Sequence, residues 1–289
     1  MNTFYQEEMK AMNRKERISE LKRNAILGNL KDTDDTESGK TRSRVGGKPC
    51  LPEDMEWPCN TPEEGESVGR PLSFVAQFDF EELAEYDLEQ VLPQKGVVYF
   101  FYDFVEEPAG FMVREKEAAR ILFYEGDIGK LKEREFPEEL EEDFRIPRFD
   151  IQFTTQSEVP MCEEYEQLTR ENVSYGEYDD DVEELGFYRD GDREITKLLG
   201  YADLCQGSML LICEMIRNGI DCHNFDYLQY KDQYIGAVSD WVLLFQVDTI
   251  SNSEFELMFG DNGRLYYYIR KEDLKNKNFE KGWFMTQCY

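Results

Sequence analysis

The sequence predicts an α+β fold with a β-rich core. From residue 71 onward, short apolar runs rich in Val, Phe and Tyr recur, and each is bounded by Gly, Pro or Asp, as strands are. Helical periodicity is confined to the N-terminus and two further stretches. Two groups of strand patterns resemble each other. This indicates a core of two related, duplicated β units, mixed or antiparallel, with an N-terminal helix and few other helices.

The chain is large enough for a substantial core. It has 289 residues, of which 40% are hydrophobic and 14% aromatic. This suffices to bury one large core or two modest ones, and the aromatic content argues against a disordered chain. We expect one globular domain over residues 31–289. A helix within residues 1–30 should pack on it, because apolar residues recur every three to six positions there, a loose match to the helical period: Met9, Met12, Ile18, Leu21 and Ala25.

Eight apolar runs have the length of strands and end at turn-forming residues. The best hairpin signal lies between the last two, where Asn262 and Gly263 supply the positive φ that a tight turn needs. Further helices are expected at 80–92 and 161–172. The eight runs are PLSFVAQFDF (71–80), GVVYFFYDF (96–104), RILFYEGD (120–127), FDIQFTT (149–155), SMLLICEMI (208–216), WVLLFQVD (241–248), FELMFG (255–260) and RLYYYIR (264–270).

The expected duplication rests on two pairs of runs. PLSFVAQFD followed by GVVYFFY resembles WVLLFQVD followed by GRLYYYI, with similar spacing between the members of each pair. The two halves would cover about 42–155 and 195–289, joined by an acidic connection at 156–194. Chance is the alternative explanation, because short apolar strands resemble one another.

Two glutamines interrupt these runs at corresponding places. Gln77 and Gln246 are each followed two residues later by an aspartate, Asp79 or Asp248, and strand alternation puts each pair on one face. The two amides could form symmetry-related polar sites in a duplicated sheet. Alternatively, each amide ties down a neighbouring loop, because leaving it buried and unpaired would cost about 1–3 kcal/mol. We favour the second interpretation.

The charge is strongly negative and unevenly spread. The formal net charge is −29, and residues 125–194 hold 24 acidic and 8 basic residues. Such a field repels phosphate backbones and argues against nucleic-acid binding through a basic surface. It suits a basic protein partner, although a solvated acidic face is the simpler explanation. The candidate residues for such a partner surface are Asp179, Asp180, Asp181, Glu183 and Glu184.

The cysteines and the N-terminus indicate a compartment. There are seven cysteines, an odd number, and the N-terminal stretch lacks the apolar core of a secretory signal. No segment approaches the roughly 18 apolar residues that a membrane span needs. We therefore expect a cytoplasmic protein with reduced thiols and no contact with membranes, and we favour a monomer.

The stretch SRVGGKPCLPEDMEWP looks like a phosphate-binding loop but does not fit one. A P-loop needs Gly five residues before its Gly-Lys pair and Ser or Thr after it, and Arg42 and Pro49 occupy these positions. Gly46 and Gly47 instead predict a sharp or closely packed turn. Trp57 is expected to anchor the segment in the core.

No catalytic constellation or metal site emerges from the spacing. His223 is the single histidine, and its neighbour Cys222 would point to the opposite side of an extended chain. The sequence has no Cys-x-x-Cys motif, and its acidic runs lack the spaced ligands of an EF-hand. We predict no catalytic residues, no metal and no cofactor, and we lean towards a protein that is not an enzyme.

Several blocks together resemble the YwqG family, a bacterial domain of unknown function. They are SRVGGKPCLPEDMEWP, PLSFVAQFD, LPQKGVVYFFYD, LLGYADLCQGSMLLICEMIRNGI and the C-terminal GDNGRLYYYIRKEDL with its final QCY, and they span roughly residues 24–289. The resemblance implies a cytoplasmic, single-domain α+β protein with a duplicated core. It implies no activity, and no catalytic residue can be carried over. Thr196 stands where the family often has histidine, so this chain lacks that imidazole.

Two functions of different classes fit these observations. The first is a non-enzymatic protein-binding module, with an inhibitor or immunity-type role towards a basic partner. The alternative is a small-ligand or enzymatic site in a cleft between the two β halves. The residues expected to line this cleft are Arg44, Trp57, Gln77, Gln246, Asp261 and Arg264.

Overall fold

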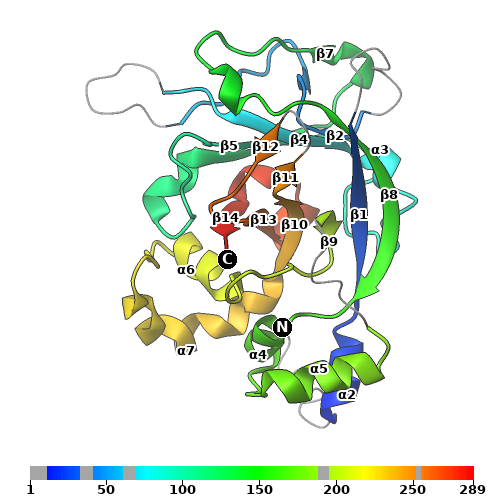
Figure 1. The fold of residues 1–289 in the computed structure, drawn as a ribbon, viewed down its shortest axis with the longest axis vertical. Coiled ribbons are helices and arrows are strands. Elements are labelled where there is room, and N and C mark those ends of the chain that lie inside the picture. The colour runs from blue at the N-terminus through cyan, green and yellow to red at the C-terminus, as the bar shows by residue number, and fades with distance from the viewer. Residues whose placement is uncertain (1–11, 33–41, 61–68, 188–194, 252–254) are drawn as a thin grey trace.

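The computed structural model is dominated by one ten-stranded sheet (Figure 1). It describes residues 12–32, 42–60, 69–187, 195–251 and 255–289. Every pair of neighbouring strands in the sheet is antiparallel, in the order β14-β13-β10-β9-β1-β8-β2-β4-β5-β6. The strands are β1 (Arg23–Asp32), β2 (Arg44–Val45), β4 (Ser73–Asp79), β5 (Val97–Tyr102), β6 (Ala119–Tyr124), β8 (Phe149–Glu158), β9 (Thr196–Leu199), β10 (Trp241–Asp248), β13 (Arg264–Arg270) and β14 (Trp283–Gln287).

The sheet curls until its two ends approach each other, so that it is nearly a barrel. Tyr267 of β13 donates a hydrogen bond from its hydroxyl to the Phe101 carbonyl of β5, at 3.1 Å. Gly282, directly before β14, is so close to Ile121 of β6 that a β-carbon at this position would lie 2.4 Å from its side chain. Two short ladders complete the strands: β3 (Cys50–Leu51) with β7 (Lys132–Glu133), and β11 (Ile250–Ser251) with β12 (Glu256–Leu257).

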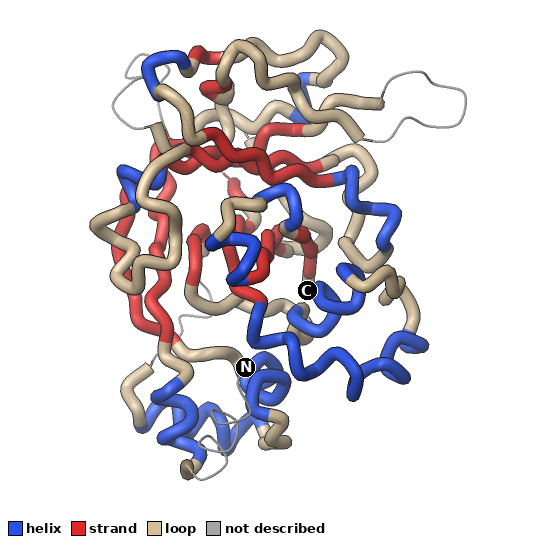
Figure 2. Tube along the Cα trace, turned by 180° about the vertical axis from the view of Figure 1, so that it is seen from behind, coloured by secondary structure: helices blue, strands red, loops and turns tan. Residues whose placement is uncertain are grey.

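Most of the longer helices gather at one end of the sheet, as Figure 2 shows from behind. None of the helices in the described ranges combines the length and the apolar character needed to cross a bilayer. The α-helices are α2 (Arg14–Glu20), α3 (Phe80–Leu83), α4 (Cys162–Thr169), α5 (Tyr175–Glu184), α6 (Leu210–Arg217), α7 (Lys231–Tyr234) and α8 (Lys271–Lys275). The 3-10 helices are η2 (Val113–Ala118), η3 (Ile128–Lys130), η4 (Glu142–Phe144), η5 (Phe225–Tyr230), η6 (Ile235–Asp240) and η7 (Phe279–Lys281).

Aromatic side chains fill the space inside the curled sheet. The ring of Phe245 on β10 lies 4.9 Å from that of Phe78 on β4 and 4.8 Å from that of Phe100 on β5, measured between centroids. Strand alternation turns Tyr99 and Phe101 to the opposite face, where they belong to a second, smaller cluster with Leu51. Both faces of β5 are therefore buried, which explains its uninterrupted apolar sequence.

The predicted β-rich core is confirmed as one large antiparallel sheet, but the structure has more helices than expected. The run at 208–216 was assigned to a strand and forms helix α6 instead. A short continuous apolar run does not distinguish a buried strand from a buried helix, and here nearly every side chain of the run is buried. The helix expected at 161–172 is present as α4, whereas the one at 80–92 is limited to α3.

The helix expected within residues 1–30 is present in part as α2, and residues 1–11 lie outside the described ranges. Helix α2 starts after Asn13, whose side chain forms a capping box with Glu16, and the chain then enters strand β1. β1 lies in the middle of the sheet, between β8 and β9. Pairing on both sides outweighs local preference at this position.

The hairpin predicted around Asn262 and Gly263 is only partly right. Asn262 has a positive φ of 47°, as the turn requires. The strand after it, β13, pairs with β10 and β14, whereas the short β12 pairs with β11. The turn therefore reverses the chain without joining the two strands that flank it in sequence, because the longer β10 offers β13 a better ladder.

Candidate functional site

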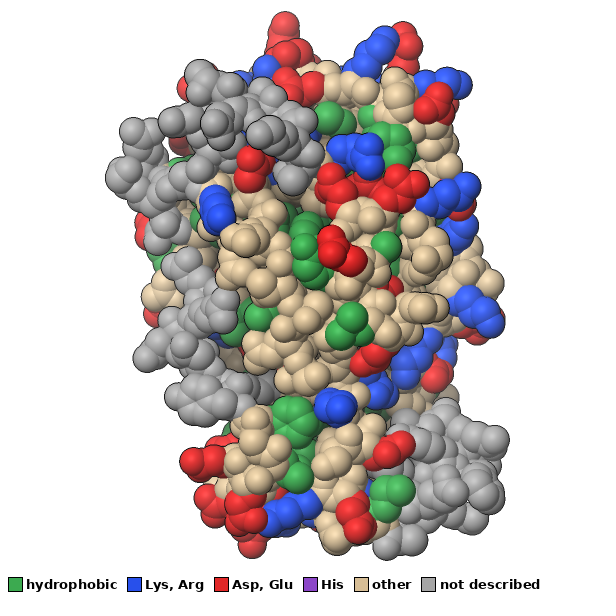
Figure 3. Space-filling model, turned by 90° about the vertical axis from the view of Figure 1, so that its right-hand side faces the viewer, with side chains coloured by type: hydrophobic (Ala, Val, Ile, Leu, Met, Phe, Trp, Pro, Cys, Tyr) green, Lys and Arg blue, Asp and Glu red, His purple; other side chains and the backbone are tan. Residues whose placement is uncertain are grey.

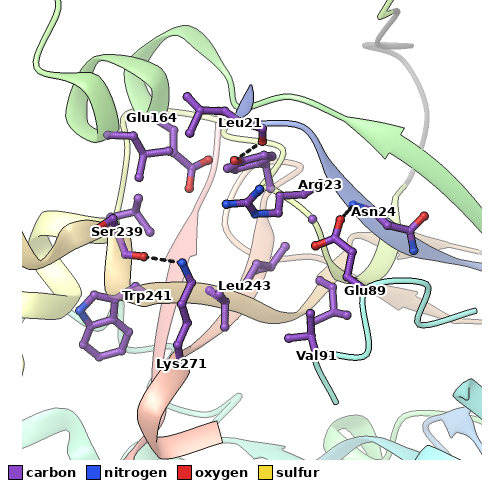
Figure 4. A pocket seen from close by; sticks show the side chains of 16 residues that line it. Leu21, Arg23, Asn24, Glu89, Val91, Glu164, Ser239, Trp241, Leu243 and Lys271 are labelled. Atoms are coloured by element: carbon purple, nitrogen blue, oxygen red, sulfur yellow. Dashed lines mark hydrogen bonds between the residues drawn. The ribbon is translucent and has the colours of Figure 1, made fainter. Parts of the chain in front are cut away.

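A cavity of about 500 Å³ opens at the helical end of the sheet (Figure 4). Its lining comes from the start of β1, the start of β10, the end of β9, helix α4 and the first residue of α8. Because several strands end at this rim, side chains from distant parts of the sequence meet there. The residues that matter for its chemistry are Arg23, Glu89, Glu164, Trp241, Leu243 and Lys271.

The walls of the cavity are mainly apolar and held in place. Trp241 is buried, and its indole nitrogen donates to Glu214 Oε2 at 2.8 Å, which fixes the orientation of the ring. Leu199 and Leu243 are buried beside it. Tyr201 closes another side by donating its hydroxyl proton to the Leu21 carbonyl. These contacts give the cavity a preformed apolar surface, as small-molecule sites usually have.

Two cations reach into the cavity without a carboxylate partner. Lys271 Nζ donates to the Ser239 carbonyl at 2.8 Å, and Arg23 Nη1 donates to the Lys22 carbonyl at 3.0 Å. Neither side chain forms an ion pair within the described ranges. Partial burial lowers the pKa of Lys271, and the charge of Arg23 lowers that pKa further. Lys271 keeps exposed surface because the cavity is open to solvent.

Two carboxylates, those of Glu89 and Glu164, face the same space. Glu89 accepts the backbone N–H of Asn24 at 2.6 Å. Glu164 on α4 is buried and has an interaction partner of its own. Figure 4 shows the head groups of Arg23, Glu164 and Lys271 turned towards one another around the cavity.

The six side chains expected to line a cleft lie outside this cavity. Gln77 is fully buried, donates to the Arg42 carbonyl at 2.7 Å and accepts the Cys50 N–H at 2.8 Å. Arg44 is buried nearby and donates from Nη2 to the Lys48 carbonyl and to Cys50 Sγ, the latter at 3.2 Å. The structure thus brings Gln77 and Arg44 together around one loop.

Gln246 and Arg264 form a second, separate group around Asp203. The Gln246 amide accepts the Asp203 N–H at 2.9 Å and donates to the Ile195 carbonyl at 2.9 Å. Arg264 donates to the Asp203 carbonyl at 3.1 Å, and its Nε lies 2.6 Å from Asp248 Oδ2. Each glutamine therefore bonds the backbone of a neighbouring loop.

The remaining two residues of that prediction lie apart from both groups. Trp57 is half-buried, with its ring 5.5 Å from that of Phe101 and its indole nitrogen bonded to the Leu72 carbonyl at 2.9 Å. Asp261 is exposed in the turn before β13, and its carbonyl accepts the Tyr289 N–H.

Sequence reasoning missed a buried ion cluster around Lys197. This side chain is fully buried, with Nζ 3.0 Å from Glu158 Oε2 and 2.6 Å from Asp203 Oδ2. Lys197 lies opposite Gln246 in the β9–β10 ladder, as Arg44 lies opposite Gln77 in the β2–β4 ladder. The signal in the sequence is a lysine within the apolar run TKLL.

The acidic residues of α5 are partly neutralised by α2. Asp181 is buried and pairs with Arg14 at 2.5 Å and with Lys15 at 3.5 Å, and Lys15 also binds Glu184. Figure 3 shows acidic and basic side chains mixed at this end of the molecule. The other three predicted residues, which are exposed and have no ion-pair partner in the described part of the chain, are Asp179, Asp180 and Glu183.

No group of His, Cys, Asp and Glu in the described ranges could hold a metal ion. His223 is exposed, and its Nε2 lies 3.4 Å from the side-chain nitrogen of Asn224.

No curated protein matches the sequence. The sequence model of one family matches residues 43–288, which include nine of the ten strands of the sheet. The chain therefore belongs to this family, which is described as a domain of unknown function (DUF1963).

Proposed function

We propose that this protein binds a small organic molecule in the cavity between Arg23, Trp241 and Lys271. The observation that carries the proposal is a preformed space of about 500 Å³ whose apolar walls surround a few converging charged groups. Ligand sites of proteins have this size and this combination of surfaces. The function is the small-ligand alternative of the sequence analysis, at a different place from the cleft expected there.

Filling the cavity tests the proposal. Val91 lines the cavity from the loop after α3, and Val91→Trp would place a larger side chain in it. The neutral fluorescent probe N-phenyl-1-naphthylamine should bind the unmodified protein and bind the variant about tenfold or more weakly, because overpacking costs roughly 1–3 kcal/mol. Leu88→Trp is the matched control, since Leu88 is 65% exposed in the same loop and does not line the cavity. Equal binding by all three proteins would refute the proposal.

A second candidate function is the binding of a basic protein partner, in an inhibitor or immunity-type role. The exposed carboxylates of Asp179, Asp180 and Glu183 favour it, because α2 leaves them available. An affinity pull-down at low and high salt tests this role with a double variant that carries both Asp179→Lys and Asp180→Lys. A variant with Glu85→Lys and Glu280→Lys changes the net charge equally at other exposed sites. A partner retained equally by both variants would contradict this role.

We also infer that the two arms of the sheet arose by duplication. The order β2-β4-β5-β6 on one side of the β1–β8 pair corresponds to β9-β10-β13-β14 on the other. In support, the hydroxyls of Tyr99 and Tyr266 each donate to a backbone carbonyl at 2.7 Å, and these two tyrosines lie opposite Gln77 and Gln246 in their ladders. Superposing the arms should bring Gln77 onto Gln246. A best fit that pairs β4 with β13 would contradict the duplication. Membership of the YwqG family stays a prediction.

A further inference from the structure

We propose that the ligand of the cavity is an amphiphilic organic anion, with a carboxylate or phosphate head held between Arg23 and Lys271 and an apolar part against Trp241. The inference rests on the proposed function, because it assigns a ligand class to the same cavity. It follows from the hydrogen bonds and ion pairs that the charged groups around the cavity form.

The two cations have donors to spare. A guanidinium has five N–H donors and an ammonium has three, yet within the described part of the chain Arg23 and Lys271 each donate one hydrogen bond, to a neutral backbone carbonyl. A backbone carbonyl compensates the charge of a cation less completely than a carboxylate does. The free N–H groups are therefore available to an oxyanion, which Arg binds in a bidentate manner.

Within the described residues, the carboxylates around the cavity form no ion pair with Arg23 or Lys271. Glu89 is held by the Asn24 N–H, and Asp240 pairs with Arg270 at 2.6 Å. Both raise the pKa of Lys271, but less than burial and Arg23 lower it. Glu164 also faces the cavity and has a partner of its own. The charge of Arg23 lowers the pKa of Lys271, which shows that the two cations repel each other across the opening, and a bound anion would relieve this repulsion.

The walls define the rest of the ligand. An apolar surface lies beside the cations and is formed by Trp241, Leu199 and Leu243. An ion without an apolar part would leave this surface in contact with water. An amphiphile matches both surfaces at once. Octanoate, octyl phosphate, 1-octanol and octylamine have the same chain and differ in their head groups, so they separate the two contributions.

Calorimetric titration of these four probes at low salt tests the head group. Octanoate or octyl phosphate should bind about tenfold or more tightly than 1-octanol, because hydrogen bonds to charged groups exceed neutral ones by about this factor, and octylamine should bind most weakly. The tighter of the two anions identifies the head group. Binding of 1-octanol or octylamine as tight as that of both anions would overturn the inference.

Charge-removing variants locate the anion. Arg23→Gln and Lys271→Gln should each weaken binding of the preferred anion about tenfold and leave 1-octanol unchanged. Lys275→Gln is the control, because Lys275 is exposed on the same helix α8 and does not line the cavity. Anion binding that survives both pocket variants would overturn the inference. Thermal unfolding of each variant checks its fold.

The neutral naphthylamine probe separates the two levels of the proposal. If it binds and Val91→Trp blocks it while the anions show no preference, the cavity is a ligand site and the anionic class is wrong. If neither the neutral probe nor any octyl compound binds, the proposed function itself fails.

Discussion

Gln77 and Gln246 form matching pairs of hydrogen bonds on opposite arms of one sheet. Each amide nitrogen donates to a carbonyl before a short strand, and each amide oxygen accepts an N–H from the loop after it. Both side chains are fully buried. Replacing either one would leave loop donors and acceptors without partners inside the protein.

Gln77→Leu and Gln246→Leu should each lower the free energy of unfolding by about 1–3 kcal/mol. Gln77→Glu should also destabilise, because a carboxylate cannot donate to the Arg42 carbonyl. Chemical denaturation measures the effect, with Gln229→Leu as an exposed control. A loss below about 0.5 kcal/mol for both glutamines would show that the loops hold without them.

Lys197 and Arg44 occupy corresponding positions but have different surroundings. Lys197→Met should cost about 3–5 kcal/mol, because it removes the cation that pairs with the buried Glu158 and the half-buried Asp203. Arg44→Met should cost less, since the partners of Arg44 are a carbonyl and a thiol. Adding Glu158→Gln to Lys197→Met should restore part of the loss. Urea titrations of the four proteins check this order, and a larger loss for Arg44→Met would reverse it.

Gly46 cannot carry a side chain where it lies. Its φ is +63°, and a β-carbon would be 2.1 Å from the Pro147 carbonyl oxygen. Gly46→Ala should therefore destabilise the protein by more than the roughly 1–3 kcal/mol of backbone strain alone. Gly176→Ala is the opposite case, because this position in α5 has open space and should gain roughly 0.5–1 kcal/mol. Thermal unfolding should show shifts of opposite sign.

Alkaline pH should weaken the contact of α2 with α4. The pKa of Tyr165 is raised to about 12, chiefly by burial, with Arg17 opposing the rise and Glu171 adding to it. An unfolded tyrosine has a pKa of about 10. The folded state therefore holds the proton more tightly, and the stabilisation is complete below pH 10 and lost as pH rises towards 12.

Tyr165→Phe tests this dependence, because it removes the proton and keeps the ring. Between pH 9 and 11.5, the variant should lose stability less steeply than the unmodified protein in denaturation experiments. Burial also raises the pKa of Cys162 in the same cluster to about 11, so Cys162→Ser should reduce the slope at slightly lower pH. Parallel stability curves for all three proteins would contradict the assignment.

The sequence by itself determined the longer strands of the two arms, namely β4, β5, β6, β10 and β13, but it did not predict β2, β9 or β14. The runs containing Gln77 and Gln246 are apolar, contain Val and Phe, and are bounded by turn-forming residues, a combination that is typical of strands. The close turn at Gly46 and the positive φ at Asn262 were equally readable, because each depends on a local backbone conformation. The excess of acidic residues is also evident from the sequence. Which of these residues form ion pairs is not.

Only the tertiary structure decided the rest. β1 is a strand because β8 and β9 pair with it on both sides, and α6 is a helix although its run has the length of a strand. Asp181 is neutralised by Arg14, from a helix far away in the sequence. The cavity depends most strongly on tertiary structure. Arg23, Trp241 and Lys271 carry no common motif, and they meet because an antiparallel sheet brings the ends of distant strands to one rim.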